Sequence, residues 1–183
     1  MEEERLIEYI KRTIKIKSAD VVVGPGDDTA VLKYNSKYYL LLTTDTIVEN
    51  VHFKRSHASL AQIGRKAMAV NLSDISAMGG LPLYALVSIG LPEGFQKTIS
   101  FLLKGMEQMA KTYRFDIVGG NLSRSSILFI DVSMAGIVEK KNVKLRSGAG
   151  TGDGIYVTGS LGGSLAGKHL QIKPRIKESR HLI

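Results

Sequence analysis

The stretch Ile63–Gly80, IGRKAMAVNLSDISAMGG, decides the fold because it predicts a buried central helix. Its residues favour helix and no proline interrupts them. Apolar side chains occupy two faces at helical spacing: Ile63, Ala67, Val70 and Met78 on one, and Met68, Leu72 and Ile75 on the other. A helix that is apolar around most of its circumference is usually buried. We therefore expect the rest of the chain to pack around it.

Asp74 lies on the first of these apolar faces, one turn after Asn71. A buried carboxylate must be paired, hydrogen-bonded or bound to a metal ion, because burying it alone costs several kcal/mol. One interpretation is that Asp74 holds a neighbouring backbone group or an arginine in place. Acidic residues upstream favour a second interpretation, in which Asp74 binds a metal ion.

Two adjacent carboxylates, Asp27 and Asp28, follow the Gly24-Pro25-Gly26 turn that ends a β-rich run. They repel each other unless a cation or hydrogen-bond donors lie between them. An Asx-type turn or a helix cap is the alternative to a metal site.

A third acidic position closes the predicted strand YYLLLTTDT, which ends in Thr43, Thr44 and Asp45. Hydroxyl and carboxylate oxygens are hard ligands of the kind that magnesium prefers. Seven residues later His52 stands in VENVHF. A lone histidine is most often structural, but this one follows an acidic strand end, where a ligand could reach it.

The remaining pattern predicts alternating helices and strands. An amphipathic helix over residues 2–14 directs Leu6, Ile7, Ile10 and Ile14 toward the core, and a break is expected at Leu81-Pro82-Leu83. Strands are expected at 31–34 and 38–46 as a hairpin, and at 84–91, 115–118, 127–138 and 155–158. Helices are expected at 96–113 and within 159–170, and the basic segment 172–183 has few apolar residues to fix it to a core.

Composition excludes several classes of protein. The chain has 183 residues, enough for one domain and the beginning of another. It has no cysteine, which excludes disulfides, thiol nucleophiles and zinc–thiolate sites. No apolar run suggests a leader or a membrane span, so a cytoplasmic protein without membrane partners is expected.

The formal net charge of +8 raises the question of nucleic acid. Aromatic residues are few and no nucleic-acid motif is present, so nucleic-acid binding is not expected. A basic surface serves phosphorylated small molecules equally well. Neither a Walker A loop nor a GxGxxG fingerprint occurs. The carboxylates at 27, 28, 45 and 74 suit phosphoryl transfer, in which cations bridge phosphate oxygens.

Five segments carry a family resemblance in one order: GPGDDTAVL, TTDTIVENVHF, IGRKAMAVNLSDISAMGGLP, VGGNLSRS and RSGAGTGDGIYVTGSLGGSLAG. Together they resemble the thiamine-monophosphate kinases, over about Leu6 to Leu170. These kinases belong to a superfamily with aminoimidazole ribonucleotide synthetase, selenophosphate synthetase and the hydrogenase maturation protein that makes the cyanide ligand. That last protein would need a C-terminal cysteine, which this chain lacks.

The resemblance implies transfer of the γ-phosphate of ATP onto thiamine monophosphate, with Mg²⁺ and without a covalent or acid–base catalytic residue. The implied magnesium ligands are Asp27, Thr43, Thr44, Asp45, Asp74 and Asn121, the last standing where the family more often has aspartate. His52 would contact thiamine phosphate, and Gly119, Gly120 and Arg146 would contact ATP. Leu103 falls where an ATP-contacting tyrosine is common.

The implied fold is α+β, a mixed or antiparallel sheet with helices packed on one face, as in the N-terminal domain of aminoimidazole ribonucleotide synthetase. The family usually dimerises by pairing two such sheets into a barrel, so a homodimer is expected. Residues 1–150 would form the N-terminal ATP- and magnesium-binding and dimerisation domain, and 151–183 the start of a largely missing second domain. Two alternatives remain: a catalytically incomplete dimerisation and nucleotide-binding module, or a related ATP-dependent synthetase acting on another small molecule.

Overall fold

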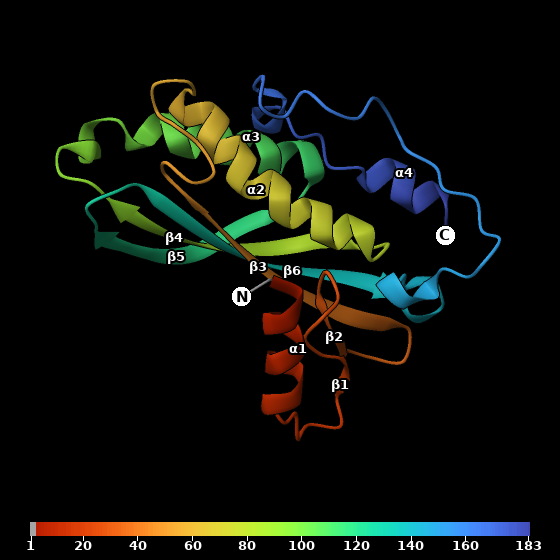
Figure 1. Cartoon of the computed structure of the whole chain (residues 1–183). Helices are drawn as coiled ribbons and strands as arrows, with labels where there is room; N and C mark the ends of the chain where they lie inside the picture. Colours follow the sequence, from red (N-terminus) through yellow and green to blue (C-terminus); the bar gives the residue numbers. More distant parts are fainter. Residues whose placement is uncertain (1–2) are drawn as a thin grey trace.

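The computed structural model describes residues 3–183 (Figure 1) and contains a six-stranded mixed sheet with helices packed on one face. This confirms the expected α+β class. The strands are β1 Val21–Val23, β2 Ala30–Lys33, β3 Tyr38–Val48, β4 Leu81–Leu91, β5 Asp116–Arg124 and β6 Phe129–Glu139. The helices are α1 Glu3–Thr13, α2 Leu60–Ala77, α3 Ile99–Tyr113 and α4 Ile176–His181, with short 3₁₀ turns η1 Phe95–Lys97, η2 Lys140–Asn142, η3 Arg146–Gly148 and η4 Lys168–Leu170.

The strand order is β1-β2-β3-β6-β4-β5, and only the pair β4–β5 is parallel. Both β3 and β4 run antiparallel to β6, so they are parallel to each other with β6 between them. Parallel strands need a long crossover connection. Helix α2 supplies it between β3 and β4, and α3 supplies it between β4 and β5. Both helices therefore lie on the same face of the sheet.

Helix α2 is the buried central helix that the sequence predicts. Its N-cap is Ser59, whose hydroxyl accepts from the backbone N–H of Gln62, and the Gln62 side chain accepts from the Ser59 backbone N–H. This capping box satisfies two backbone donors that the first turn would otherwise leave free. The fully buried side chains of the core come mainly from α2, α3, β3 and β6: Leu41, Ile63, Met68, Leu72, Ile75, Leu102, Met106, Ile130 and Met134.

Two glycines let α2 and α3 approach backbone to backbone. A Cβ atom on Gly64 would lie 2.2 Å from the Leu102 carbonyl oxygen, and one on Gly105 would lie 2.0 Å from the Ala61 carbonyl oxygen. Neither position has room for a methyl group. The distance between the two helices is therefore set by these glycines.

The predicted hairpin is present as β2 and β3, with the Asn35 side chain accepting from the backbone N–H groups of Lys37 and Tyr38. The expected break at Leu81-Pro82-Leu83 is wrong, because β4 begins at Leu81 and pairs with β6 through Pro82. The strand expected at 115–118 continues as β5 to Arg124, because its backbone pairs in parallel with β4 through both glycines.

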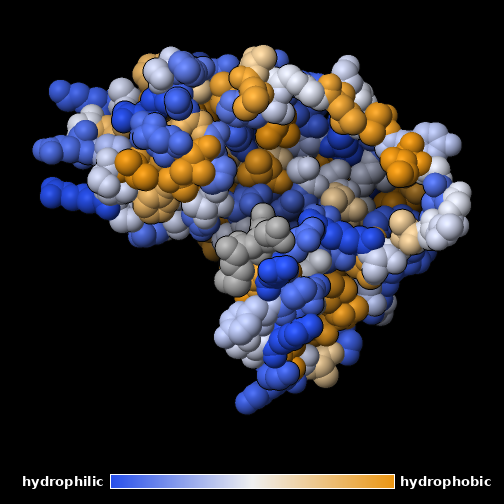
Figure 2. All heavy atoms as spheres, viewed as in Figure 1, coloured by the Kyte–Doolittle hydropathy of each residue, from blue (hydrophilic) through white to orange (hydrophobic). Residues whose placement is uncertain are grey.

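The N-terminal helix forms, but its apolar face does not reach the core. Leu6 and Ile14 are 41% and 54% exposed, and Ile7 and Ile10 are only partly buried. In Figure 1, α1 projects from the sheet beside β1 and β2. Figure 2 shows hydrophobic and hydrophilic side chains side by side on this projecting part. The amphipathic pattern predicted the helix correctly and its packing wrongly, because no other described element covers it.

The C-terminal expectations need three corrections. Residues 155–158 form no strand, and Ile155 and Tyr156 are almost fully exposed. Segment 159–170 contains only η4 rather than a longer helix, since its four glycines adopt positive φ angles. Segment 172–183 is anchored, because Ile176 is buried and the Ser179 hydroxyl donates to the Ser76 carbonyl oxygen on α2 at 2.6 Å. Within residues 3–183, none of the helices is both long and apolar enough to cross a membrane.

Candidate metal and nucleotide site

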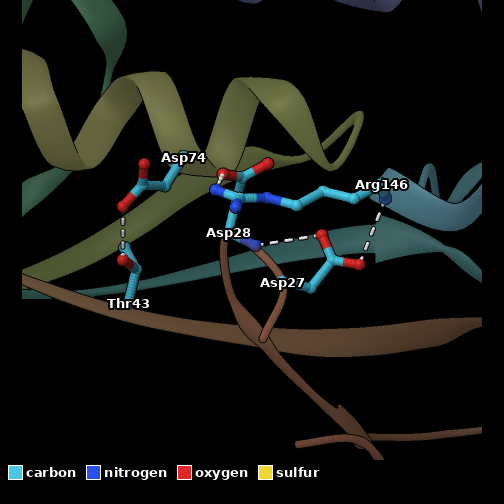
Figure 3. A network of polar contacts seen from close by, with 5 residues as sticks. All are labelled: Asp27, Asp28, Thr43, Asp74 and Arg146. Atoms are coloured by element: carbon cyan, nitrogen blue, oxygen red, sulfur yellow. Dashed lines mark hydrogen bonds and ion pairs between the residues drawn. The ribbon is translucent and has the colours of Figure 1, made fainter. Parts of the chain in front are cut away.

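Asp74 of α2 points toward the strand end predicted to carry magnesium ligands. The Thr43 hydroxyl, on β3, donates a 2.6 Å hydrogen bond to Asp74 Oδ2 (Figure 3). Asp74 is partly buried rather than fully buried. Burial raises the pKa of its carboxyl to about 6; the Thr43 hydrogen bond opposes this rise, and the nearby charges of Asp45 and Asp28 add to it. The charge of Arg146 also opposes the rise, but burial outweighs both favourable contributions.

Asp27 and Asp28 meet Arg146 at the same place (Figure 3). Asp27 accepts from the Arg146 backbone N–H at 3.2 Å through Oδ2, and from the Asp28 backbone N–H at 2.9 Å through Oδ1. The Arg146 guanidinium forms an ion pair with the Asp28 carboxylate. This pairing raises the pKa of Arg146, with further contributions from the charges of Asp27 and Asp74. Arg146 thus supplies positive charge among three carboxylates that come from a turn and a helix.

Asp45 lies two residues after Thr43 on β3, so its side chain points to the same face of the sheet. Burial raises the pKa of Asp45, whereas the nearby His52 lowers it. His52 is exposed in the loop after β3, and its Nδ1 accepts from the Val48 backbone N–H at 3.0 Å. The structure therefore brings Asp27, Thr43, Asp45, Asp74 and Arg146 together, with His52 at the border of the group.

The oxygen donors of this group suit magnesium, but they do not form a complete coordination shell by themselves. In residues 3–183, no three His, Asp or Glu side chains converge closely enough to hold a metal ion alone. Magnesium is usually held by one or two carboxylates, with water and substrate phosphates completing its shell. Asp74 and Asp45 supply half-buried carboxylates with raised pKa values, and Thr43 supplies a hard hydroxyl oxygen. A magnesium ion that enters the site already bound to a phosphate ligand would suit these donors.

A cavity of about 490 Å³ is lined both by residues of the acidic group and by apolar side chains. Its polar lining residues are Asp27, Asp28, Thr29, Thr43 and Thr44, and its larger apolar lining residues are Ile14, Ile16, Val21, Leu32 and Leu42. Thr29 is 2% exposed and its hydroxyl has no hydrogen-bond partner in the described chain. A buried polar atom without a partner is costly. A ligand that carries both polar and apolar groups would suit this cavity.

Thr44 does not direct its side chain into the acidic group. It lies on the face of the sheet opposite Thr43, where its hydroxyl is 3.4 Å from Asp131 Oδ1 and 3.2 Å from the Ser133 hydroxyl. Adjacent residues of a strand point to opposite faces. As a metal ligand, Thr44 could therefore act only through its backbone carbonyl in this arrangement.

Gly119, Gly120 and Asn121 are also remote from the acidic group. They lie on β5, the outermost strand, and are separated from β3 by β4 and β6. Neighbouring strands are about 4.8 Å apart, so the separation is roughly 14 Å. A Cβ atom on Gly120 would lie 1.8 Å from the Val87 carbonyl oxygen, so this glycine is explained by strand packing alone. The roles of these three residues stay predictions.

The sequence indicates Asp28 only as one of four carboxylates suited to phosphoryl transfer, and it indicates no role for Thr29. Nothing in the sequence indicates that Asp28 rather than Asp27 forms the ion pair with the Arg146 guanidinium, more than a hundred residues away in the chain. The free Thr29 hydroxyl depends on burial and has no sequence signal at all. Leu103, at the position where the family resemblance implies an ATP-contacting tyrosine, lies on α3 and is 46% exposed.

Substitution of Arg146 by alanine should change metal binding and nucleotide binding in opposite directions. Removing the guanidinium leaves Asp28 unpaired, so Mg²⁺ alone should bind more tightly, by a few-fold. Loss of a cation for the phosphates should weaken Mg²⁺-dependent binding of an ATP analogue by about tenfold. Calorimetric titration with each ligand measures both. Weaker binding of Mg²⁺ alone would contradict the placement of Arg146 as a counter-ion.

Comparison with known proteins identifies the family. Residues 26–138 match the family model described as "AIR synthase related protein, N-terminal domain". The chain is 41% identical over 176 residues to the thiamine-monophosphate kinase of Bacillus subtilis (strain 168), covering 94% of this chain and 54% of that protein. It is 42% identical over 168 residues to the thiamine-monophosphate kinase of Aquifex aeolicus (strain VF5), covering 90% and 51% respectively.

A solved structure described as "AaThiL complexed with AMPPCP and TMP" is similar throughout the chain. The TM-score is 0.86 at 36% sequence identity, covering 98% of this chain and 62% of that one. The chain thus spans about half the length of the curated relatives it matches. The resemblance read from the sequence is confirmed, and since the family model matches well over half of its residues, the chain belongs to the AIR synthase related proteins.

Proposed function

We propose that the chain forms the ATP- and magnesium-binding part of a thiamine-monophosphate kinase. In this reaction a phosphate oxygen of thiamine monophosphate forms a bond to the γ-phosphorus of ATP. The bond from that phosphorus to the β,γ-bridging oxygen breaks, and ADP leaves with its electron pair. The products are thiamine diphosphate and ADP.

The observation that carries this proposal is the meeting of Asp27, Asp28, Asp74, the Thr43 hydroxyl and Arg146 at one place beside β3. Asp74 and Asp45 have raised pKa values, and Arg146 alone of the basic side chains forms an ion pair there within residues 3–183. The similarity over 98% of the chain to a structure complexed with AMPPCP and TMP supports the same assignment. Phosphoryl transfer needs charge neutralisation and alignment more than covalent chemistry.

Each residue of the group then has a separate task. Asp27, Asp45 and Asp74 would hold magnesium, with Thr43 fixing the orientation of Asp74 through its hydrogen bond. Magnesium would supply neutralisation of phosphate charge. Arg146 would exchange its pairing with Asp28 for a phosphate oxygen, because guanidinium binds both groups in the same manner. His52 would contact the acceptor.

A product assay tests the proposal. Incubation with ATP, Mg²⁺ and thiamine monophosphate should yield thiamine diphosphate and ADP in equal amounts, and nothing when Mg²⁺ is chelated. A panel with other small-molecule acceptors separates this activity from that of a related synthetase. Turnover of another acceptor in place of thiamine monophosphate would contradict the substrate assignment.

The alternative is a dimerisation and nucleotide-binding module that does not turn over by itself. The chain spans about half the length of its curated relatives, which is why this alternative is kept. It predicts Mg²⁺-dependent nucleotide binding without product. The assay is therefore run in parallel on the 183-residue chain and on a fusion carrying the second half of the Bacillus subtilis relative.

The proposal includes a homodimer formed through the sheet face that α2 and α3 leave open. Four large apolar side chains line a groove of about 460 Å³ there: Leu42, Tyr84, Leu86 and Val118, each between 41% and 57% exposed. An apolar patch of this kind on a sheet usually marks a protein interface. A second copy offers the same patch, as a two-fold interface requires. The expected cytoplasmic location stays a prediction.

Leu86→Lys should convert the dimer to a monomer without unfolding the chain. The side chain is 51% exposed, so the lysine reaches water in the monomer but would be buried without a partner in the dimer. Sedimentation velocity measures the change. Leu103→Lys, at a similarly exposed leucine on α3, is the matched control and should remain dimeric. A wild-type chain that sediments as a monomer at every concentration would contradict the proposed interface.

A further inference from the structure

A second cavity, of about 530 Å³, is lined by the loop after β3 that carries His52, by Lys66 of α2 and by Ser164, Leu165, His169 and Leu170. We call it the Lys66 pocket. Its basic lining residues are His52, Lys54, His57, Lys66 and His169. Within residues 3–183, no aspartate or glutamate lines it. The pocket is therefore opposite in charge to the acidic group a short way along α2.

Lys66 is the feature that needs an explanation. It is only 8% exposed, and its Nζ donates to the His52 carbonyl oxygen at 2.6 Å and lies 2.8 Å from His169 Nδ1. No carboxylate in the described chain forms an ion pair with it. Burial lowers the pKa of Lys66, and burial together with the Lys66 charge lowers the pKa of His169. A buried ammonium without an anion is unfavourable, and one of its three N–H donors is still free.

The walls of the pocket are fixed rather than loose. Glu49 is buried, and its carboxylate accepts from Arg55 Nε at 2.5 Å and from the Leu128 backbone N–H at 3.1 Å. These bonds link Glu49 to Arg55 on the far side of His52 in the same loop, and anchor Glu49 to Leu128, which immediately precedes β6. Because His52 Nδ1 accepts from the Val48 backbone N–H, the neutral ring carries its proton on Nε2. That proton is available as a donor.

Taken together, a buried cation with a free donor, an imidazole N–H and further basic side chains make a site for a compact anion. We propose that the Lys66 pocket binds the phosphate group of the acceptor substrate, with Lys66 as a direct phosphate ligand. This inference rests on the proposed function and deepens it. The site rejects a cationic ring, so the thiazolium end of thiamine monophosphate lies outside the basic cluster. His52 joins the two sites, because it lines this pocket and also lowers the pKa of Asp45.

The first experiment uses inorganic phosphate as the probe and the four histidines as reporters. Three of them, His52, His57 and His169, line the pocket, whereas His181 lies on α4 outside it. In ¹H–¹³C spectra of the imidazole rings at constant ionic strength, phosphate should shift the first three with one saturable affinity and leave His181 unchanged. Equal shifts of all four rings, or no shift of the pocket histidines, would overturn the proposal.

Variants assign the effect to Lys66. Lys66→Met keeps the volume and removes the charge, and should weaken phosphate binding by roughly tenfold or more, as loss of a charged hydrogen bond does. Lys66→Arg should retain most of the affinity, and keeps the test valid if the methionine variant unfolds. Arg65→Met, the neighbour on α2 that does not line the pocket, is the matched control and should bind as the parent does. Undiminished phosphate binding by a folded Lys66→Met chain would overturn the assignment.

Further ligands separate this inference from the proposed function. Thiamine monophosphate should shift the pocket histidines, thiamine without phosphate should not, and AMPPCP with Mg²⁺ should bind equally to the parent and to Lys66→Met. If thiamine monophosphate binds the parent and Lys66→Met alike, the inference fails while the proposed function stands. If the pocket binds inorganic phosphate but not thiamine monophosphate, the proposed acceptor is wrong and Lys66 remains the ligand of an anion.

Discussion

Asp74→Asn should abolish magnesium-dependent nucleotide binding and at the same time make the folded chain more stable. The amide keeps an oxygen that can accept from the Thr43 hydroxyl, so the local hydrogen bond survives. It removes a carboxylate that lies near Asp45 and Asp28. We expect affinity for Mg²⁺–AMPPCP to fall roughly 100-fold, since even residues outside the first ligand shell of a metal commonly change affinity by 10–100-fold.

The gain in stability follows from the pKa of Asp74. The carboxyl has a pKa of about 6 in the folded chain against 3.8 for the free group, so the folded state binds more protons between these values. The penalty for ionising it is absent below the lower pKa, grows between the two and is complete above about pH 6. Asp74→Asn should therefore stabilise the apo chain by about 1 kcal/mol at pH 8, allowing for screening at a half-buried site, and by almost nothing at about pH 4.

Thermal unfolding at the two pH values measures this, and calorimetric titration measures the loss of binding. Asp116→Asn is the matched control, since this aspartate is exposed at the start of β5 away from the acidic group. A variant that binds Mg²⁺–AMPPCP as tightly as the parent would mean that Asp74 is structural. A variant that loses binding and also unfolds more easily would mean that the carboxylate stabilises the fold, contrary to its raised pKa.

Gly105→Ala should be the most destabilising single methyl addition that the α2–α3 contact allows. In an isolated helix alanine is better than glycine by about 1 kcal/mol. Here the new Cβ would lie 2.0 Å from the Ala61 carbonyl oxygen, which is backbone and cannot turn aside. Overpacking of this kind costs about 3 kcal/mol, so the clash outweighs the propensity and a net loss of about 2 kcal/mol is expected.

Chemical denaturation measures the loss, and a chain of this size should also melt roughly 5 °C lower. Gly148→Ala is the control, because a Cβ atom there would have nothing within 4 Å and the glycine does not need a positive φ. It should leave the free energy of unfolding unchanged within about 0.5 kcal/mol. A Gly105→Ala chain as stable as the parent would mean that the two helices separate freely and that the glycines do not set their distance.

Local patterns predicted most of the sheet and both covering helices, because hydrophobic spacing and turn chemistry act over a few residues. The run around Leu72 predicts α2, and Asn35 predicts the hairpin turn. The prediction ended too early at β5, since its glycines weaken a strand pattern and only the pairing with β4 sustains it. It gave helix α1 correctly but not its packing, and it failed for residues 155–170, because a residue pattern indicates an element but not what that element packs against.

The candidate site was predictable as a set of chemical groups and not as an arrangement. Asp74 could be found because a carboxylate on an apolar helix face needs a partner. Its contact with Thr43 depends on how α2 crosses β3. The nearby charges of Asp28 and Arg146 depend on the contact of Asp28 with a loop more than a hundred residues away in the chain. Lys66 carries no comparable sequence signal, because a lysine near a helix start is usually solvated and its burial is a tertiary property.

The most direct test of a magnesium–phosphate site among Asp27, Asp45 and Asp74 is a site-resolved titration of the 183-residue chain with AMPPCP, with and without Mg²⁺. In ¹H–¹⁵N spectra, the amides of these residues, of Thr43 and of Arg146 should shift together, saturate, and do so only when Mg²⁺ is present. Amide shifts that are the same with and without Mg²⁺ would contradict the proposed magnesium–phosphate site. Shifts confined to other amides, with these amides unchanged, would contradict it as well.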